Sequence, residues 1–225
     1  MRCTKSWEKV FVLLAEKIKT LQVINKTSRI ALVLNTCLSN EELFLVHRIF
    51  QKDLKVERIF FADPVPGESD HFLLTVDRSP NKRGAQELSF ELKNPDLESL
   101  SRNTDILVVF GHFLQSHFSL GDIKNALDKI GVKLLLTSHT TNFNSVFDFI
   151  LPTSLIAEKE GSLTNVDGKI QKFSPGLEPL GESRPEWEVL LSLAKELKTN
   201  YRYYYSLTSP AAILREMGKE IPFFK

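Results

Sequence analysis

The sequence predicts an α/β fold: a doubly wound, mostly parallel sheet with helices on both faces, followed by a turn-rich C-terminal segment. Three observations favour this fold class. Short, continuous apolar runs recur along the chain, as expected for strands that are covered on both faces. Amphipathic segments lie between these runs, and right-handed crossovers connect such a series most simply into a parallel sheet. The chain has 225 residues, 42% of them apolar, which is enough to bury a core without disulfides or metals.

The first elements follow from apolar spacing. Apolar residues from Trp7 to Leu21 recur at three- and four-residue intervals and predict an amphipathic helix. The run Ile30–Leu34 predicts the first strand. Ser39 and Glu42, three residues apart, predict a capping box at the start of the next helix.

The middle of the chain continues the alternation. Strands are predicted at 59–61, 105–110 and 132–136, and apolar residues from Ile123 to Ile130 predict a helix between the last two. Residues 62–84 contain three prolines, several acidic residues and a basic run. This composition favours a long surface loop.

The pattern changes after residue 152. We expect residues 1–152 to form a nucleotide-binding-like α/β domain, and residues 153–225 to form a turn-rich segment and C-terminal helices packed on the same domain. Glycines and prolines between 161 and 181 mark the turns. A hairpin is predicted around 165–168, where Gly168 readily accepts a positive φ.

Charge and cysteine content argue against several classes of protein. The 29 Lys and Arg residues against 28 Asp and Glu give a net charge of +1, which provides no field for binding nucleic acid. No apolar run approaches the roughly 20 residues of a membrane span, and Arg2 and Lys5 argue against a secretory signal. Only Cys3 and Cys37 are present, so no iron–sulfur cluster or structural zinc is expected on this chain alone. We therefore expect a cytoplasmic protein without a direct membrane span.

Polar loops follow three predicted strands, at 35–40, 111–114 and 137–142. Ligands of open parallel sheets bind beyond the carboxyl ends of the strands, so these loops could hold phosphate or sugar oxygens. Ordinary capping and turn formation explains the same residues, and we favour it on residue preferences alone. No dinucleotide fingerprint, P-loop or GxSxG elbow occurs, and His112 and His117 lie on different faces of a helix. No catalytic or metal-binding residue is predicted.

Two further features are interpreted as structural. Glu158 and Glu160 flank Lys159, and nothing apolar beside them argues for a raised carboxyl pKa, so we expect a solvated charged patch. Cys37 is expected to be a small buried hydrophobic side chain rather than an activated thiol.

Residues 151–171 read LPTSLIAEKEGSLTNVDGKIQ. This segment resembles a motif of the molybdopterin oxidoreductase family, LP-x(4)-A-E-K-E-G-[ST]-[FL]-T-N-x-[DE]-G-[RK]-[IV]-Q, and 179–187 resembles the family's P-x-G-E-[AS]-[RK]-P-[DE]-W. Segments 39–42, 66–73 and 77–85 are similar to one branch of the family, the large iron–sulfur subunit of bacterial NADH:quinone oxidoreductase, respiratory complex I.

The chain also departs from the family. Residues 111–114 stand where the family has a cofactor-contacting G-x-N-P turn, residues 137–144 replace its Q-D-x-F-x-T-E-T loop, and its cysteine-rich N-terminal segments have no counterpart. The resemblance therefore implies a non-catalytic structural domain or subunit that supports an electron-transfer assembly. Its expected partners are other subunits of a redox complex, which would hold it at the inner face of the membrane. No cofactor is expected to bind to this chain alone.

Two alternatives stay open. The chain could be part of a split molybdopterin oxidoreductase that contributes to binding a pterin guanine dinucleotide (molybdopterin guanine dinucleotide), with the redox centres on other chains. The resemblance then implies Gly111, Thr164, Asn165 and Gly168 as cofactor-binding residues. An independent small-molecule binder on the same fold would need no missing partner.

Overall fold

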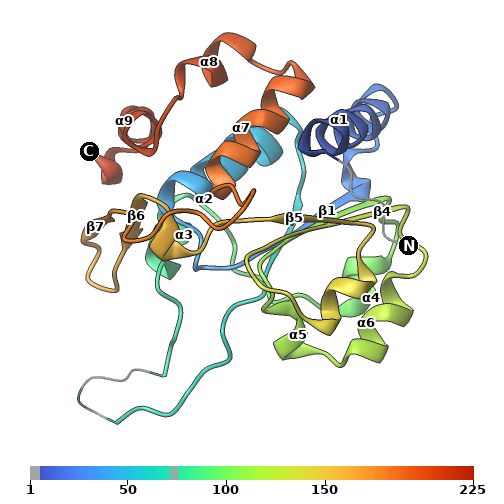
Figure 1. Ribbon diagram of the computed structural model, residues 1–225, viewed down its shortest axis with the longest axis horizontal. Coiled ribbons are helices and arrows are strands. Elements are labelled where there is room, and N and C mark those ends of the chain that lie inside the picture. Colours follow the sequence, from blue (N-terminus) through green and yellow to red (C-terminus); the bar gives the residue numbers. More distant parts are fainter. Residues whose placement is uncertain (1–5, 71, 73–75) are drawn as a thin grey trace.

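The computed structural model of the chain describes residues 6–70, 72 and 76–225. Arg2, Cys3, Lys5 and part of the 66–73 motif lie outside the described residues. The described residues form a layered α/β structure in which a sheet lies between two sets of helices (Figure 1). The predicted fold class is therefore confirmed.

Five parallel strands form the sheet in the order β2-β1-β3-β4-β5. Every residue of β1, β3 and β4 is buried, which explains their nearly uninterrupted apolar sequences. The strand order reverses between β1 and β3, so the crevice where open α/β sheets bind ligands lies beyond the carboxyl ends of these strands. The bounds are β1 (Ile30–Leu34), β2 (Arg58–Phe61), β3 (Ile106–Phe110), β4 (Val132–Thr137) and β5 (Phe149–Pro152).

Helices α1 (Trp7–Val23), α2 (Asn40–Val46) and α7 (Glu186–Leu197) cover one face of the sheet (Figure 1). The apolar stripe predicted for α1 is buried in this layer. The predicted capping box is present, because the Glu42 amide donates to Ser39 Oγ at 3.2 Å and the Ser39 amide donates to Glu42 Oε2 at 2.9 Å. After α2 the chain continues as a wider, π-helical turn, His47–Asp53.

Helices α4 (Leu97–Ser101), α5 (Leu114–His117) and α6 (Leu120–Leu127) cover the other face. They pack on the alternate strand residues, such as Val33, Val109 and Leu135. The helix predicted over 123–130 corresponds to α6, which begins earlier, at Leu120, and also ends earlier, at Leu127.

The predicted hairpin is confirmed as an antiparallel pair, β6 (Gly161–Thr164) and β7 (Ile170–Phe173), beside α2 and α3 (Lys82–Glu87). Helices α8 (Tyr201–Ser206) and α9 (Pro210–Glu220) follow, and α9 packs against α2. The division at residue 152 stays a prediction. Single 3-10 turns occur at Thr27–Arg29, Asn142–Val146, Ile156–Glu158 and Pro222–Phe224.

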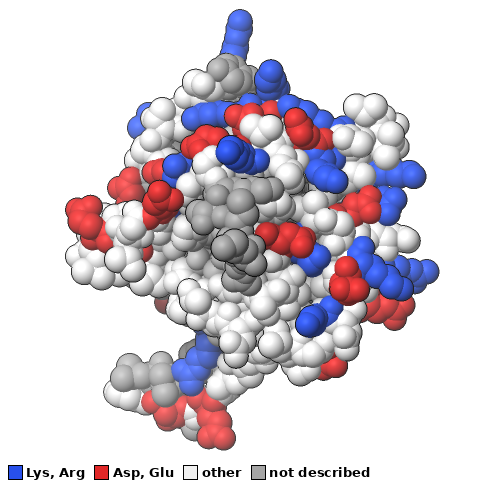
Figure 2. Space-filling model, turned by 45° about the vertical axis from the view of Figure 1, so that its right-hand side comes forward, with Lys and Arg blue, Asp and Glu red and all other residues white. Residues whose placement is uncertain are grey.

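The described residues of the predicted surface loop extend away from the sheet in Figure 1. Its described residues are irregular up to Asn81, but α3 then begins at Lys82, so the loop is shorter than predicted. The reason is Asn81, whose side chain donates to the Leu38 carbonyl at 2.9 Å and fixes the start of α3. Acidic and basic side chains are interspersed on the face shown in Figure 2. Among the described residues, no helix combines the length and apolar character that a membrane span requires.

Candidate functional site

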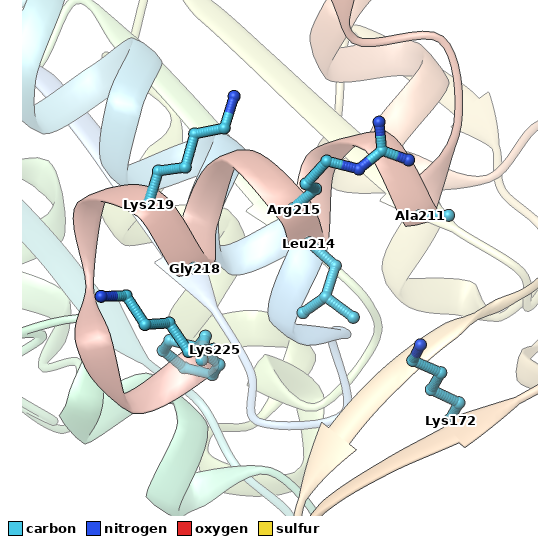
Figure 3. Close-up of a pocket in the computed structure, with 8 residues that line it drawn as sticks. Lys172, Ala211, Leu214, Arg215, Gly218, Lys219 and Lys225 are labelled. Carbon is cyan, nitrogen blue, oxygen red and sulfur yellow. The ribbon is translucent and has the colours of Figure 1, made fainter.

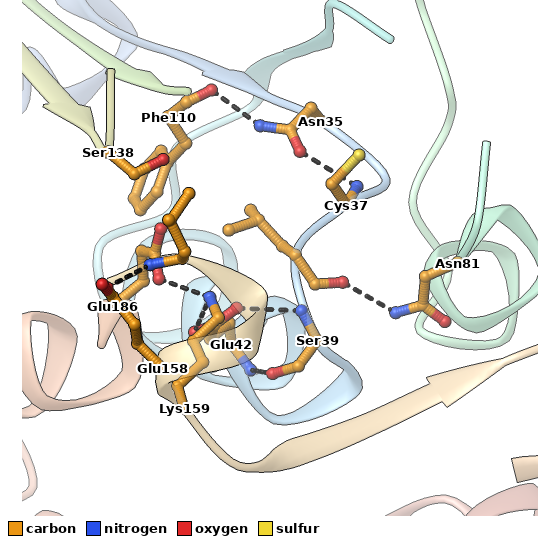
Figure 4. A network of polar contacts seen from close by, with 12 residues as sticks. Asn35, Cys37, Ser39, Glu42, Asn81, Phe110, Ser138, Glu158, Lys159 and Glu186 are labelled. Carbon is orange, nitrogen blue, oxygen red and sulfur yellow. Dashed lines mark hydrogen bonds and ion pairs between the residues drawn. The ribbon is translucent and has the colours of Figure 1, made fainter. Parts of the chain in front are cut away.

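The loops after β1 and β3 are joined at the carboxyl edge of the sheet. The Asn35 side chain donates from Nδ2 to the Phe110 carbonyl at 2.8 Å, and its Oδ1 accepts from the Cys37 amide at 2.9 Å (Figure 4). Asn35 is buried. One amide side chain therefore fixes the spacing between the ends of two neighbouring strands.

Gly111 follows β3 in the left-handed region, with φ +76°. A Cβ at this position would lie 2.7 Å from Asn35 Nδ2. We expect Gly111→Ala to lower the free energy of unfolding by about 1–3 kcal/mol, because it adds backbone strain and a steric clash. Gly176→Ala is the control, since its Cβ would meet nothing within 4 Å, and should change stability by less than about 1 kcal/mol. Equal effects in urea unfolding would contradict this account.

Aromatic rings lie at the same edge. The ring centroid of His112 is 4.5 Å from that of Phe113 and 4.2 Å from that of His139. Burial, together with the proximity of His139, lowers the pKa of His112. The lowered pKa favours the neutral form of His112 at pH 7, and its ring stacks on that of Phe113. His139 Nδ1 lies 2.9 Å from the hydroxyl of exposed Ser138.

A cavity of about 180 Å³ lies beyond the carboxyl ends of β4 and β5. It is smaller than the roughly 300–1,000 Å³ of complete small-molecule sites. The Ser183 hydroxyl oxygen is buried and has no hydrogen-bond partner among the described residues, so it is available to a ligand. The hydroxyl side chains of the wall are Thr137, Ser138, Thr140, Thr153 and Ser183, and apolar side chains include Ile150, Leu155 and Leu180.

Three of the four predicted cofactor-binding residues lie in the β6–β7 hairpin. Thr164 is buried, its hydroxyl donates to Asn40 Oδ1 at 3.1 Å, and its amide donates to Asn81 Oδ1 at 2.7 Å. Asn165 closes the turn through its own side chain, and Gly168 has φ +81°. The fourth residue follows β3 and contacts the β1 loop instead. That a cofactor binds to these four residues stays a prediction. They are Gly111, Thr164, Asn165 and Gly168.

Lys159 is buried between two carboxylates, so the prediction of a solvated charged patch is wrong. The residue is 6% exposed, and Nζ lies 2.7 Å from Glu42 Oε1 and 2.5 Å from Glu186 Oε2 (Figure 4). Glu160 alone is exposed, and Glu158 accepts a backbone N–H. The two partners come from the first turn of α2 and the start of α7, and nothing in the sequence beside Lys159 signals them.

We term Lys159, Glu42 and Glu186 the Lys159 triad. Burial would lower the pKa of Lys159, but the charges of Glu186 and Glu42 outweigh burial and raise it. Burial raises the pKa of Glu186 to about 7, because Lys159 offsets only part of that effect. Burial opposes the ionisation of Glu42 as well, yet Lys159 lowers the pKa of this carboxyl. At neutral pH Lys159 and Glu42 are therefore charged, and Glu186 is about half protonated.

The first turn of α2 also holds β6 directly. Glu41 accepts from the Ser162 amide at 2.9 Å and from its hydroxyl at 2.8 Å. Asn40 Nδ2 donates to Ser162 Oγ at 3.1 Å. Negative side chains are favourable in the first turn of a helix. These contacts and the Lys159 triad together fix residues 159–164 to α2.

Cys37 is half-buried, and burial, with a smaller effect of Asp63, raises the pKa of its thiol to about 11. The thiol is therefore protonated at neutral pH and is a poor nucleophile, in line with its structural interpretation. His117 contacts the Asp63 carbonyl at 2.8 Å. In the part of the chain that the structure describes, no group of three or more His, Cys, Asp or Glu side chains could hold a metal ion.

Comparison with known protein families matches residues 82–196 to the family described as Molybdopterin oxidoreductase. The match covers just over half of the chain. The chain belongs to the molybdopterin oxidoreductase family. The matched range contains β3, β4 and β5, the whole cavity lining, the hairpin and Lys159.

Three relatives among curated proteins illustrate the likeness. The "Putative formate dehydrogenase SH0748" of Staphylococcus haemolyticus is 26% identical over 178 residues, which are 78% of this chain and 15% of that protein. The "Probable oxidoreductase YjgC" of Bacillus subtilis is 36% identical over 98 residues, 44% of this chain and 9% of the relative. The "Putative formate dehydrogenase SAUSA300_2258" of Staphylococcus aureus is 28% identical over 102 residues, which are 45% of this chain and 10% of that protein.

The matched part of the chain corresponds to between 9% and 15% of the length of these relatives. Their names are those of formate dehydrogenases and of an oxidoreductase. The comparisons therefore support the molybdopterin oxidoreductase family, but they do not support the narrower resemblance to the large subunit of complex I.

The residues at the carboxyl edge fit one part of a pterin guanine dinucleotide. The hydroxyl-lined cavity and the buried Ser183 hydroxyl suit hydrogen bonds to a sugar or a base. The cavity is too small for the whole cofactor. Its lining includes the acidic side chain of Glu158 and no Lys or Arg, so the phosphate charge would have to be balanced elsewhere.

Proposed function

We propose that the chain supplies the guanosine-binding part of a molybdopterin oxidoreductase whose redox centres lie on other chains. The observation that carries the proposal is the hydroxyl-lined cavity beyond β4 and β5 with its buried, unpartnered Ser183 hydroxyl. All residues that line this cavity lie in the range that matches the family. The names of the relatives make a formate dehydrogenase the assembled enzyme that we favour.

In this proposal the residues of this chain bind and orient the cofactor. The pterin cofactor, when bound, supplies the redox chemistry through its metal. The Ser138 and Ser183 hydroxyls line the cavity and donate to the sugar or base. The Lys159 triad keeps the adjoining segment in place by ion pairs to two helices.

Exposed apolar side chains beside the cavity support the presence of a further part of the enzyme. Leu155 and Leu180 line the cavity, and Leu180 is 82% exposed. Leu177, close by in the sequence, is also exposed. Contiguous exposed apolar side chains mark surfaces that another chain or segment covers. The cofactor would then lie between this surface and that covering part.

Calorimetric titration with GDP tests the proposal, with CDP as the matched nucleotide. We expect GDP to bind more tightly than CDP, and Ser138→Trp, which fills the cavity, to weaken GDP binding by at least about tenfold. Ser28→Trp at the opposite edge of the sheet is the control, because Ser28 is exposed and precedes β1. Absence of GDP binding, or equal binding by both variants, would contradict the proposal.

The absence of Lys and Arg from the cavity lining favours a second candidate, a non-catalytic scaffold in an electron-transfer assembly. Purification from the native host separates the two candidates. The guanosine-binding part should retain a pterin and release a guanine nucleotide on denaturation. A scaffold should co-purify with redox subunits while yielding neither compound.

A further inference from the structure

A second concave site lies between α9 and β7, and it shares no lining residue with the cavity beyond β4 and β5. Its volume is about 510 Å³. The floor is apolar and includes Ala211, Leu214 and Phe224, and Figure 3 shows Leu214 pointing from α9 toward the strand that carries Lys172. We term this site the α9 groove.

The floor of the α9 groove is formed by close packing. A Cβ at Gly218 would lie 2.9 Å from the carbonyl oxygen of Phe224. Glycine at this position therefore lets the final turn of the described chain lie directly on α9. Phe224 is buried as a result, so the floor is preformed.

Cations surround this apolar floor. Lys172, Arg215 and Lys225 line the groove, and among the described residues none of the three has an ion-pair partner. Lys219 also lines it but is paired with Glu216 at 2.5 Å. An apolar floor with a cationic rim complements an anionic partner that carries an apolar side chain.

The strand beside the groove favours an extended partner. Among the described residues β7 pairs only with β6. The outer edge of β6 is already occupied, because its Ser162 and Thr164 amides donate to side chains of Glu41 and Asn81. The outer edge of β7 can therefore still pair with the backbone of an extended peptide.

We propose that the α9 groove binds an extended acidic segment of a partner protein, which seats an apolar side chain on Leu214 and pairs its carboxylates with Lys172 and Arg215. The segment runs along the open edge of β7. The site needs no cofactor, so it stands independently of the guanosine-binding proposal. It identifies the side of the molecule through which this chain joins an assembly.

A defined peptide tests this site. The probe is an acetylated, amidated heptapeptide in which Glu and Leu alternate, titrated calorimetrically into the full chain. One comparison peptide has Ser in place of Leu, and another has Lys in place of Glu. The double variant Lys172→Glu, Arg215→Glu should weaken binding of the probe by at least about tenfold. The double variant Lys124→Glu, Lys129→Glu carries the same charge change on exposed residues at and just beyond α6, and should bind like wild type.

Each outcome of these titrations either supports or overturns the proposal. Binding that requires both Glu and Leu, and that is lost only in the groove variant, supports the proposal. Equal weakening by the two double variants would mean that net charge, not the groove, attracts the peptide, and would overturn it. Binding to phosphatidylserine vesicles but not to the peptide would overturn it in favour of a lipid surface. Circular dichroism of both double variants checks that they are folded.

Discussion

Lys159→Met is expected to lower the free energy of unfolding by about 3–5 kcal/mol at pH 7. Methionine is similar in length but leaves Glu42 and Glu186 buried without their shared cation. Removing one member of a buried ion pair is costly for this reason, whereas the net contribution of the intact pair is smaller. Urea unfolding followed by circular dichroism measures the difference.

The matched control is Lys169→Met in the neighbouring turn, where the lysine side chain is exposed. It should change stability by less than about 0.5 kcal/mol. Glu42→Gln and Glu186→Gln added to Lys159→Met should recover part of the loss, because they remove the uncompensated charges. If Lys159→Met proved as mild as Lys169→Met, the Lys159 triad would not hold segment 159–164 in place.

Glu186→Gln is expected to change how stability depends on pH. Burial raises the pKa of Glu186 from its usual 4.5 to about 7, so the folded chain binds this proton more tightly than the unfolded chain. The stabilisation from protonated Glu186 is fully present below pH 4.5 and is lost as pH rises through 7. Wild type should therefore lose up to about 3 kcal/mol from this group between pH 4.5 and 7.

Glutamine cannot ionise, so the Glu186→Gln profile should be flatter in that range. Glu42 acts with the opposite sign, because its pKa is lowered and its contribution is lost only as the medium becomes more acidic than pH 4.5. The measurement is a series of urea titrations from pH 4.5 to 7.5 on both proteins. Parallel profiles would show that Glu186 does not carry the raised pKa.

Local sequence is sufficient to predict the layers of the fold. The runs of β1, β3 and β4 are buried on both faces and are therefore apolar at every or nearly every position. The capping box of Ser39 and Glu42 is equally local, since both hydrogen bonds form within three residues. Helix α3 is different, because Asn81 fixes its start by a contact to Leu38, 43 residues away, and local composition there predicts only a loop.

The candidate site is harder to predict because its contacts are distant in sequence. Glu158 and Glu160 beside Lys159 suggest a solvated patch, but the partner Glu42 is 117 residues away. The cavity combines residues after β4 with Ser183, which precedes α7. The polar loops are nevertheless predicted at the correct sheet edge, because the carboxyl ends of parallel strands necessarily meet there.

The most direct test of guanosine binding is an amide chemical-shift titration of the isotope-labelled chain with GDP. The account predicts that shifts concentrate at residues that line the cavity, and that the amide of Lys172 stays unchanged. The expected residues are 137–140, Thr153, Leu155, Leu180 and Ser183. Shifts elsewhere, or none at saturating GDP, would contradict the assignment of this edge as a nucleotide site.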